Sequence, residues 1–336
     1  MTHCSELNTL PSEHTDYIAL ARHLNLSLEE QLGHRAWRGL TPAGNPVVLK
    51  TGPGVSSNLL DFLAKFKSLY PPFDYPRIIS AQPGFYLVYD FIPGYPLSQG
   101  KFEAEASLAA AFELSGRISA LFRSLRLAPM FQGLQDHGAG QQDQQKGAAQ
   151  RLAALGSGFD CQVDGLALRR WEASQSYAWA QGIVPYCSSR WLRDDSGLAP
   201  RWSALRDRVE TVTSIHLAAY GSNLAHTCFT PEHLLSLPED RWGVVGWQVA
   251  PRPYNYMRYR YLAWCLVHTA QGDIENRYRQ FFDFMPAIHS SAANSLTFAL
   301  SLLETWVEIK KVIELRTEKV QVICRFIDEA LEETGG

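Results

Sequence analysis

The residues most suggestive of chemistry lie close together in segment 226–235, HTCFTPEHLL. Its His226, Cys228 and His233 carry imidazole and thiol groups, which suit zinc and, where a cysteine stands beside a histidine, nucleophilic catalysis. Zinc sites, however, use closely paired ligands and usually four of them, and a catalytic cysteine needs a further group to orient its histidine. The sequence supplies neither feature. We therefore expect no metal site here and interpret Cys228 as a buried, inert thiol.

The first third of the chain has the pattern of strands with one helix. Two apolar runs, 35–40 and 46–50, flank a turn rich in Pro, Gly and Asn, which predicts a β-hairpin. Segment 58–70 has helically spaced apolar residues and ends at a pair of prolines, which predicts a helix. A second pair of strands follows, at 77–82 and 85–92.

Beyond residue 97 the pattern becomes helical and is interrupted by one hairpin. Helices are predicted at 102–127, 166–184, 200–220 and, in two or three pieces, 255–332. The hairpin is predicted at 233–250, with a second strand over 242–250, and the Gln- and Gly-rich segment 132–150 predicts a mobile surface loop. We divide the chain into an N-terminal tail at 1–16, a mostly β part at 17–97 and a helical part at 98–336.

Composition limits the classes of protein to which the chain can belong. A chain of 336 residues that is 46% hydrophobic can bury a large core. The net charge of −3 and the scattered basic residues argue against a nucleic-acid-binding surface. No apolar stretch reaches the roughly 18 residues of a membrane span, and the six cysteines form no C-x-x-C pair. We expect a cytoplasmic protein with free thiols, no membrane span and no nucleic-acid partner.

The order of elements and several motifs resemble the aminoglycoside phosphotransferase and choline kinase-like family. Val47–Lys50 resembles the strand that carries the ATP-binding lysine of that family, and Tyr86–Leu97 resembles its hinge. The family motif H-G-D-x-x-P-x-N-[LIV]-[LIV], then a turn, then G-[VIL]-[VIL]-D-[WF]-E, is matched in spacing by HTCFTPEHLL and by GVVGWQ at 243–248. The resemblance implies an α+β, two-lobed protein-kinase-like fold, with a small, mostly β N-terminal lobe and a large helical C-terminal lobe.

The departures from this motif fall at its chemical positions. The resemblance places Cys228 at the catalytic base, His233 at a metal-binding asparagine and Gly246 at a metal-binding aspartate. Mg²⁺ prefers oxygen ligands, which a thiol, an imidazole and a glycine do not supply. His226 is retained, and we interpret it as structural. The resemblance therefore implies a degenerate, pseudokinase-like member with no expected catalytic residues and no metal site.

The resemblance also covers the positions that bind nucleotide in the family. Lys50, Asp61, Tyr89 and Phe91 match the positions that bind nucleotide in the family, although the neighbouring Phe62 fits the position of Asp61 almost as well. ATP or another nucleotide is therefore the candidate ligand, while no cofactor is required and Mg²⁺ is not expected.

Aromatic residues modify this expectation. Trp37 stands in the phosphate-covering hairpin of the resemblance and argues against a tight phosphate cradle. An aromatic cluster between Trp171 and Trp191 offers ring faces to cationic groups, or simply packs a core. Segment 252–261 is basic and aromatic, which favours a small anionic ligand or an acidic partner surface.

The sequence leaves three functions open. The first is a catalytically impaired kinase-like protein with a regulatory, scaffolding or ligand-sensing role and a protein partner. The second is an active, ATP-dependent phosphotransferase for a small hydroxylated acceptor that uses a displaced acid, Glu232, Glu239 or Asp240. The third is an interaction module whose interlobe space is closed by Trp37 and Trp247.

Overall fold

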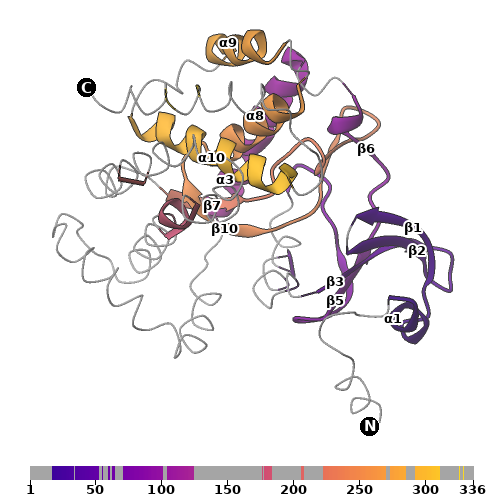
Figure 1. The fold of residues 1–336 in the computed structure, drawn as a ribbon. Helices are drawn as coiled ribbons and strands as arrows, with labels where there is room; N and C mark the ends of the chain where they lie inside the picture. Colours follow the sequence, from indigo (N-terminus) through magenta and orange to yellow (C-terminus); the bar gives the residue numbers. More distant parts are fainter. Residues whose placement is uncertain are drawn as a thin grey trace. The chain divides into compact units, whose positions relative to one another are not determined.

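We describe the protein from a computed structural model, shown in Figure 1. The described residues are 17–33, 35–52, 55, 60, 63–64, 71–100, 104–124, 176, 178–183, 206–207, 222–269, 273–284, 292–310, 325 and 328. The predicted tail 1–16, Asp61 and the predicted loop 132–150 lie outside them.

The contacts within the chain divide it into two compact units. The N-terminal unit consists of Met1–Tyr95 together with Leu235–Gln248, and the C-terminal unit consists of Pro96–Leu234 together with Val249–Gly336. The predicted division into 17–97 and 98–336 is linear, whereas the contacts assign segment 235–248 to the N-terminal unit. As predicted, the fold is α+β, with an N-terminal antiparallel sheet and a helical C-terminal part.

The N-terminal unit is built on a five-stranded antiparallel sheet with strand order β1–β2–β3–β5–β4. Its strands are β1 (Ser27–Gly33), β2 (Ala36–Leu40), β3 (Pro46–Thr51), β4 (Ile78–Gln82) and β5 (Tyr86–Asp90). The hairpins β2–β3 and β4–β5 confirm both predicted strand pairs. Strand β1 and helix α1 (Tyr17–His23) were not predicted, because β1 is exposed along almost its whole length and has no apolar alternation.

Helix α1 covers one face of this sheet. Leu20 and Ala21 of α1 pack with Val47 and Leu49 of β3 and Val88 of β5, all of them buried. Burying side chains of this size contributes roughly 1.5–3 kcal/mol each, so this small cluster fixes which face of the sheet is internal. Of the predicted helix 58–70, the described positions 60, 63 and 64 are helical.

Segment 235–248 forms the predicted hairpin but not the predicted long strand. Strands β8 (Leu234–Ser236) and β9 (Trp242–Val244) pair with each other and, through β8, with β6 (Tyr95–Pro96). The prediction of one strand over 242–250 is wrong, because β9 ends at Val244 and β10 begins only at Val249. Between them the chain turns at Gly246, whose φ of +66° lies in the left-handed region that favours glycine.

The C-terminal unit places helix α8 (Tyr256–His268) at its centre. Strands β7 (Ser222–His226) and β10 (Val249–Pro253) form an antiparallel pair in which His226 lies opposite Val249. Helix α8 is buried on nearly all sides and packs against α3 (Glu105–Ser124), α9 (Ile274–Phe284) and α10 (Ala292–Lys310), as Figure 1 shows. Burial on nearly all sides is typical of a helix at the centre of a helical core.

The predicted helices at 102–127 and beyond 255 are therefore confirmed as α3 and as α8, α9 and α10. Of the other two, the described positions 176, 178–183 and 206–207 are helical. In the part of the chain that the structure describes, no helix is long and apolar enough to cross a membrane.

Candidate functional site

The predicted nucleotide-binding residues of the N-terminal unit lie on one face of its sheet. Lys50 of β3 pairs with Leu87, and Val48 pairs with Tyr89. Side chains alternate between the faces of a strand and directly paired residues share a face, so Lys50 and Tyr89 project to the same side. The backbone N–H of Phe91 donates to the carbonyl oxygen of Pro46, which continues this register one step further. We call this surface the Lys50 face.

Tyr89 adds a phenol side chain to this face. Burial raises the pKa of the Tyr89 phenol above its ordinary value of 10.0, because a phenolate loses solvation when it is buried. Tyr89 therefore stays protonated at physiological pH and can donate a hydrogen bond to a ligand.

The ring of Phe91 is covered by a cation of the protein itself. Arg38 of β2 pairs with Val48, so it shares the Lys50 face, and its guanidinium carbon lies 4.7 Å from the centre of the Phe91 ring. Glu29 and Glu30 of β1 form ion pairs with Arg38, with N–O distances of 3.6 and 3.9 Å. No pattern in the sequence predicts this contact, because it depends on the register of three strands.

Trp37 lies on the opposite face. It pairs with Leu49, which belongs to the core under α1, and its ring centre lies 3.6 Å from that of Tyr17 in α1. The expectation that Trp37 argues against a phosphate cradle is therefore wrong, because strand alternation directs its ring away from Lys50. Trp247 also packs within the N-terminal unit: its indole N–H donates to the carbonyl oxygen of Val244 and its ring stacks on Phe73.

In the C-terminal unit, the loop that follows β7 is closed by its own hydrogen bonds. His226 is fully buried, and its Nδ1 accepts the backbone N–H of Cys228 at 3.3 Å. The backbone N–H of Thr230 donates to the carbonyl oxygen of Cys228, and that of His233 donates to the carbonyl oxygen of Thr230, both at 2.9 Å. The imidazole of His226 thus stabilises the start of the loop, and hydrogen bonds between backbone groups stabilise its later part.

The side chains at the chemical positions of this loop are only partly as expected. His233 Nδ1 lies 2.9 Å from the hydroxyl oxygen of Thr230, so this imidazole is held inside the loop. Cys228 is a free thiol but is half-buried, whereas a buried thiol was predicted; Cys265 in α8 is the fully buried one. Within the described residues, no group of three or more His, Cys, Asp or Glu side chains is arranged to hold a metal ion.

Behind the loop lies a buried polar network that the sequence did not reveal. The hydroxyl of Tyr256 donates to Glu304 Oε2 at 2.7 Å and lies 3.3 Å from the carbonyl oxygen of Thr227. The indole N–H of Trp179 donates to the other oxygen of Glu304 at 3.2 Å. Glu304 therefore joins α8, α10 and the segment around Trp179 to the loop. These residues lie far apart in the chain and form no motif.

Electrostatics in this network keep Tyr256 protonated. Burial and the nearby carboxylate of Glu304 raise the pKa of Tyr256 well above 10.0. The guanidinium carbon of Arg252 lies 5.1 Å from the ring centre of Trp179 and 5.4 Å from that of Tyr256. Arg252 belongs to the basic segment predicted to favour an anion, and here its charge is directed at aromatic rings.

Comparison with known proteins identifies the fold and no more. No protein-family model matches the chain, and no curated protein matches it. A thermostable mutant of aminoglycoside phosphotransferase APH(4)-Ia, solved with AMP-PNP and hygromycin B, has a TM-score of 0.51 at 13% identity, over 93% of this chain and 94% of its own. Amicoumacin kinase hAmiN, solved with AMP-PNP, Ca²⁺ and Ami, has a TM-score of 0.52 at 11% identity, over 96% and 94%.

An ethanolamine kinase from Plasmodium vivax has a TM-score of 0.56 at 10% identity, over 96% of this chain and 91% of its own. At such identities, a likeness in structure establishes the course of the chain and leaves its activity to be argued from the residues. This protein therefore has the α+β, protein-kinase-like fold that the aminoglycoside phosphotransferases and ethanolamine kinase share.

Proposed function

We propose that this chain is a catalytically impaired kinase-fold protein, a pseudokinase, with a regulatory, scaffolding or ligand-sensing role in the cytoplasm and another protein as its partner. It binds a nucleotide or another small anion on the Lys50 face and does not require Mg²⁺. The loop after β7 has a structural role and performs no phosphate transfer.

The observation that carries this proposal is the set of side chains at the three chemical positions of the family motif, which lacks the groups that phosphate transfer needs. Phosphoryl transfer needs a positioned base and oxygen ligands for Mg²⁺. The base position holds the thiol of Cys228, and the asparagine position holds an imidazole that contacts Thr230 at 2.9 Å. Gly246, at the aspartate position, has no side chain to offer. This donor set does not fit Mg²⁺, and loss of a general base alone slows a reaction by about 10²–10⁴-fold.

The Lys50 face supports the binding part of the proposal. It combines the ammonium of Lys50 and the protonated hydroxyl of Tyr89, on paired strands β3 and β5, with the ring of Phe91, which follows β5 and is bonded through its backbone to Pro46. An ammonium group and a hydroxyl donor suit an anionic group, while an aromatic ring suits a flat base. The predicted role of Asp61 lies outside the described residues and stays a prediction.

Nucleotide binding is tested by thermal shift of the full-length protein with ATP, ADP and GTP, each with Mg²⁺ and with EDTA. We expect a nucleotide-dependent rise in melting temperature that Mg²⁺ does not change. Lys50→Met should remove the rise, whereas Arg22→Met, which removes an exposed positive charge from α1 of the same unit, should retain it. A rise that requires Mg²⁺, or equal losses in both variants, would contradict the binding mode.

Turnover is tested separately with ATP, Mg²⁺ and hydroxylated acceptors such as hygromycin B and ethanolamine, with the phosphorylated product measured directly. We expect no product above the background without protein. Mg²⁺-dependent product would overturn the pseudokinase proposal. Comparison of Glu232→Gln, Glu239→Gln and Asp240→Asn, all at exposed positions, would then identify the acid, and Glu113→Gln at an exposed position of α3 is the matched control.

Restoring the residues of the family motif tests whether the three replaced positions explain the expected lack of Mg²⁺ binding. The triple variant Cys228→Asp, His233→Asn and Gly246→Asp supplies oxygen ligands at all three positions. If these positions alone remove the metal, the triple variant should show Mg²⁺-dependent nucleotide binding that the wild type lacks. Unchanged Mg²⁺ dependence in a variant with wild-type circular dichroism would count against this explanation.

The partner is tested by affinity capture of the tagged full-length protein from cells, followed by crosslinking. We expect a protein that co-purifies in stoichiometric amount. If the protein is recovered alone under mild conditions and its crosslinks are all internal, the scaffolding role is excluded and ligand sensing is left.

A further inference from the structure

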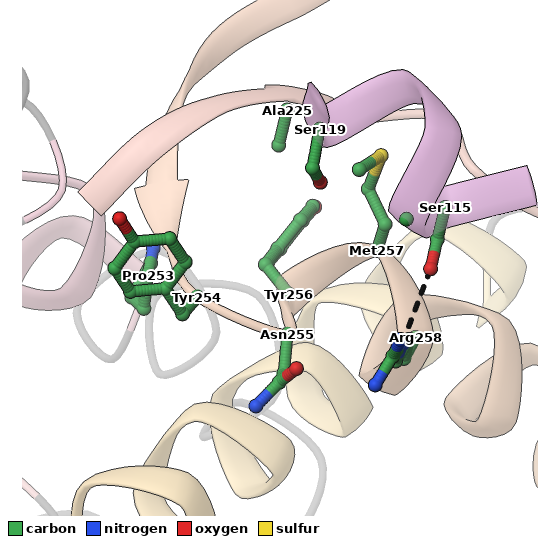
Figure 2. A pocket seen from close by; sticks show the side chains of 10 residues that line it. Ser115, Ser119, Ala225, Pro253, Tyr254, Asn255, Tyr256, Met257 and Arg258 are labelled. Atoms are coloured by element: carbon green, nitrogen blue, oxygen red, sulfur yellow. Dashed lines mark hydrogen bonds between the residues drawn. The ribbon is translucent and has the colours of Figure 1, made fainter. Parts of the chain in front are cut away.

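The C-terminal unit contains a pocket of about 200 Å³ between α3 and the start of α8. Ser115, Gly116 and Ser119 line it from α3, and the turn before α8 and the first residues of α8 line it from the other side, as Figure 2 shows. Residues 253–258 of its lining belong to the basic, aromatic segment 252–261, which the sequence predicts to favour a small anion. None of Cys228, His233, Lys50 and Tyr89 lines it, so the pocket is separate from the loop after β7 and from the Lys50 face.

Arg258, in the first turn of α8, is held in a fixed position at the edge of this pocket. Its Nε donates to the hydroxyl oxygen of Ser115 at 3.2 Å, and its guanidinium carbon lies 5.4 Å from the ring centre of Phe112. The Ser115 hydroxyl in turn donates to the carbonyl oxygen of Phe112 at 2.7 Å. Because one side of the guanidinium is anchored in this way, a ligand that meets its other nitrogens loses little side-chain freedom.

The terminal nitrogens of Arg258 make no hydrogen bond to any residue in the part of the chain that the structure describes. Among the described residues that line the pocket, Arg258 is the only one with an ionised side chain and none is acidic, so their net charge is positive. Figure 2 shows the Ser119 hydroxyl directed into the space between α3 and α8. A guanidinium fork and a hydroxyl donor are the groups that bind phosphate and carboxylate oxygens in proteins.

The start of α8 adds a weaker contribution of the same sign. Asn255, which precedes the helix, makes no capping bond with its side chain, and the first turn of α8 contains no acid. The positive end of the helix dipole, beside the pocket-lining residues 255–258, therefore has no acidic side chain in its first turn.

We propose that this pocket binds a small oxyanion, either a phosphate or a carboxylate group, through the guanidinium of Arg258 and the hydroxyl of Ser119. The proposal concerns residues outside the Lys50 face and the loop after β7, so it goes beyond the proposed function and stands if that function fails. A volume of about 200 Å³ accommodates a phosphate or a short dicarboxylate but not a whole nucleotide.

The direct test is calorimetric titration of the full-length protein with inorganic phosphate and, in a second series, with malonate, at ionic strength held constant with NaCl. We expect saturable binding of at least one of them, and the tighter one identifies the class of oxyanion. Arg258→Gln should weaken binding by roughly ten- to a hundredfold, because it removes a charge-assisted hydrogen bond. Ser119→Ala should weaken it by a smaller factor.

A pair of glycine variants separates loss of the pocket from loss of the fold. A Cβ added at Gly116 meets nothing within 4 Å, and Gly116 lines the pocket. The leucine side chain of Gly116→Leu should therefore occupy pocket space without a clash at its Cβ. Gly182 is also helical and also has open space around its Cβ position, but it lies outside the pocket. Gly116→Leu should abolish oxyanion binding, and Gly182→Leu should retain it.

The proposal is overturned if neither phosphate nor malonate binds saturably. It is also overturned if both bind equally well to the wild type, to Arg258→Gln and to Gly116→Leu. Because Arg258 also packs on Phe112, its variant is compared by circular dichroism with the wild type, and Gly116→Leu decides the outcome if Arg258→Gln is misfolded.

Discussion

The guanidinium carbon of Arg38 lies 4.7 Å from the centre of the Phe91 ring. One ring face that the sequence assigns to a nucleotide is therefore already in contact with a cation of the protein. Arg38 also forms ion pairs with the carboxylates of Glu29 and Glu30. A flat base can stack on that side of Phe91 only after Arg38 moves.

Removing this cation should improve the binding of a flat, uncharged ligand. We expect Arg38→Ala to bind adenosine more tightly than the wild type, by roughly two- to tenfold, which corresponds to the usual strength of a cation–π contact. Adenosine is the suitable probe because it carries no phosphate that Arg38 could attract. Arg38→Lys, which keeps a cation, is the control and should resemble the wild type. Weaker adenosine binding to Arg38→Ala in equilibrium dialysis would refute this role.

The hydrogen bond between Tyr256 and Glu304 should contribute measurably to stability. Tyr256→Phe leaves the half-buried carboxylate of Glu304 with one donor fewer and removes the hydroxyl that lies near the Thr227 carbonyl. We expect a loss of about 1–3 kcal/mol in the free energy of unfolding, measured by urea denaturation. Tyr95→Phe is the matched control, because Tyr95 is 78% exposed and its loss should change stability by less than about 0.5 kcal/mol.

The same tyrosine should make the protein sensitive to alkali. The pKa of Tyr256 is raised in the folded protein, so the folded state keeps this proton when the unfolded chain, with its pKa near 10.0, has lost it. The stabilisation is complete below pH 10 and is lost as the pH rises from 10 towards the folded pKa. Above pH 10 we therefore expect unfolding free energy to fall more steeply in the wild type than in Tyr256→Phe. Equal slopes would show that Tyr256 does not titrate in this range.

The left-handed backbone at Gly246 should restrict what can replace it. With φ at +66°, alanine at this position should destabilise the N-terminal unit by about 1–2 kcal/mol, while aspartate, which tolerates this conformation better, should cost less. Gly33→Ala is the control, because its Cβ meets nothing within 4 Å and its φ lies outside the strained range. We expect the urea concentration at the unfolding midpoint to be highest for the wild-type glycine, lower for Gly246→Asp and lowest for Gly246→Ala.

Many of the strands and helices of this fold could be predicted from the sequence, but the face of the sheet on which each side chain lies could not. The hairpin that presents Lys50 was predictable, because its two apolar runs flank a turn of Pro, Gly and Asn. The faces of Trp37 and Arg38 were not, because they depend on the register of β2 against β3, and a shift of one residue exchanges them.

The candidate site shows the same limit. The positions of Cys228, His233 and Gly246 could be read from a motif, since they lie at fixed spacing in a short segment. Tyr256 and Glu304 could not, because they stand 48 residues apart and only the packing of α8 on α10 brings them together. The break between β9 and β10 was missed because Gly246 and its neighbours have the composition of a continuous strand.

The pairing of β8 with β6 and β9 also determines when the N-terminal unit can complete its folding during synthesis. That unit takes its last stretch, Leu235–Gln248, from beyond a long segment that belongs to the other unit. During synthesis, which runs from the N-terminus, the five-stranded sheet emerges early, but β6 must wait for β8 until most of the C-terminal unit's first segment has been made. A chain that stops before residue 235 therefore lacks part of both units, and neither can be prepared as one uninterrupted fragment.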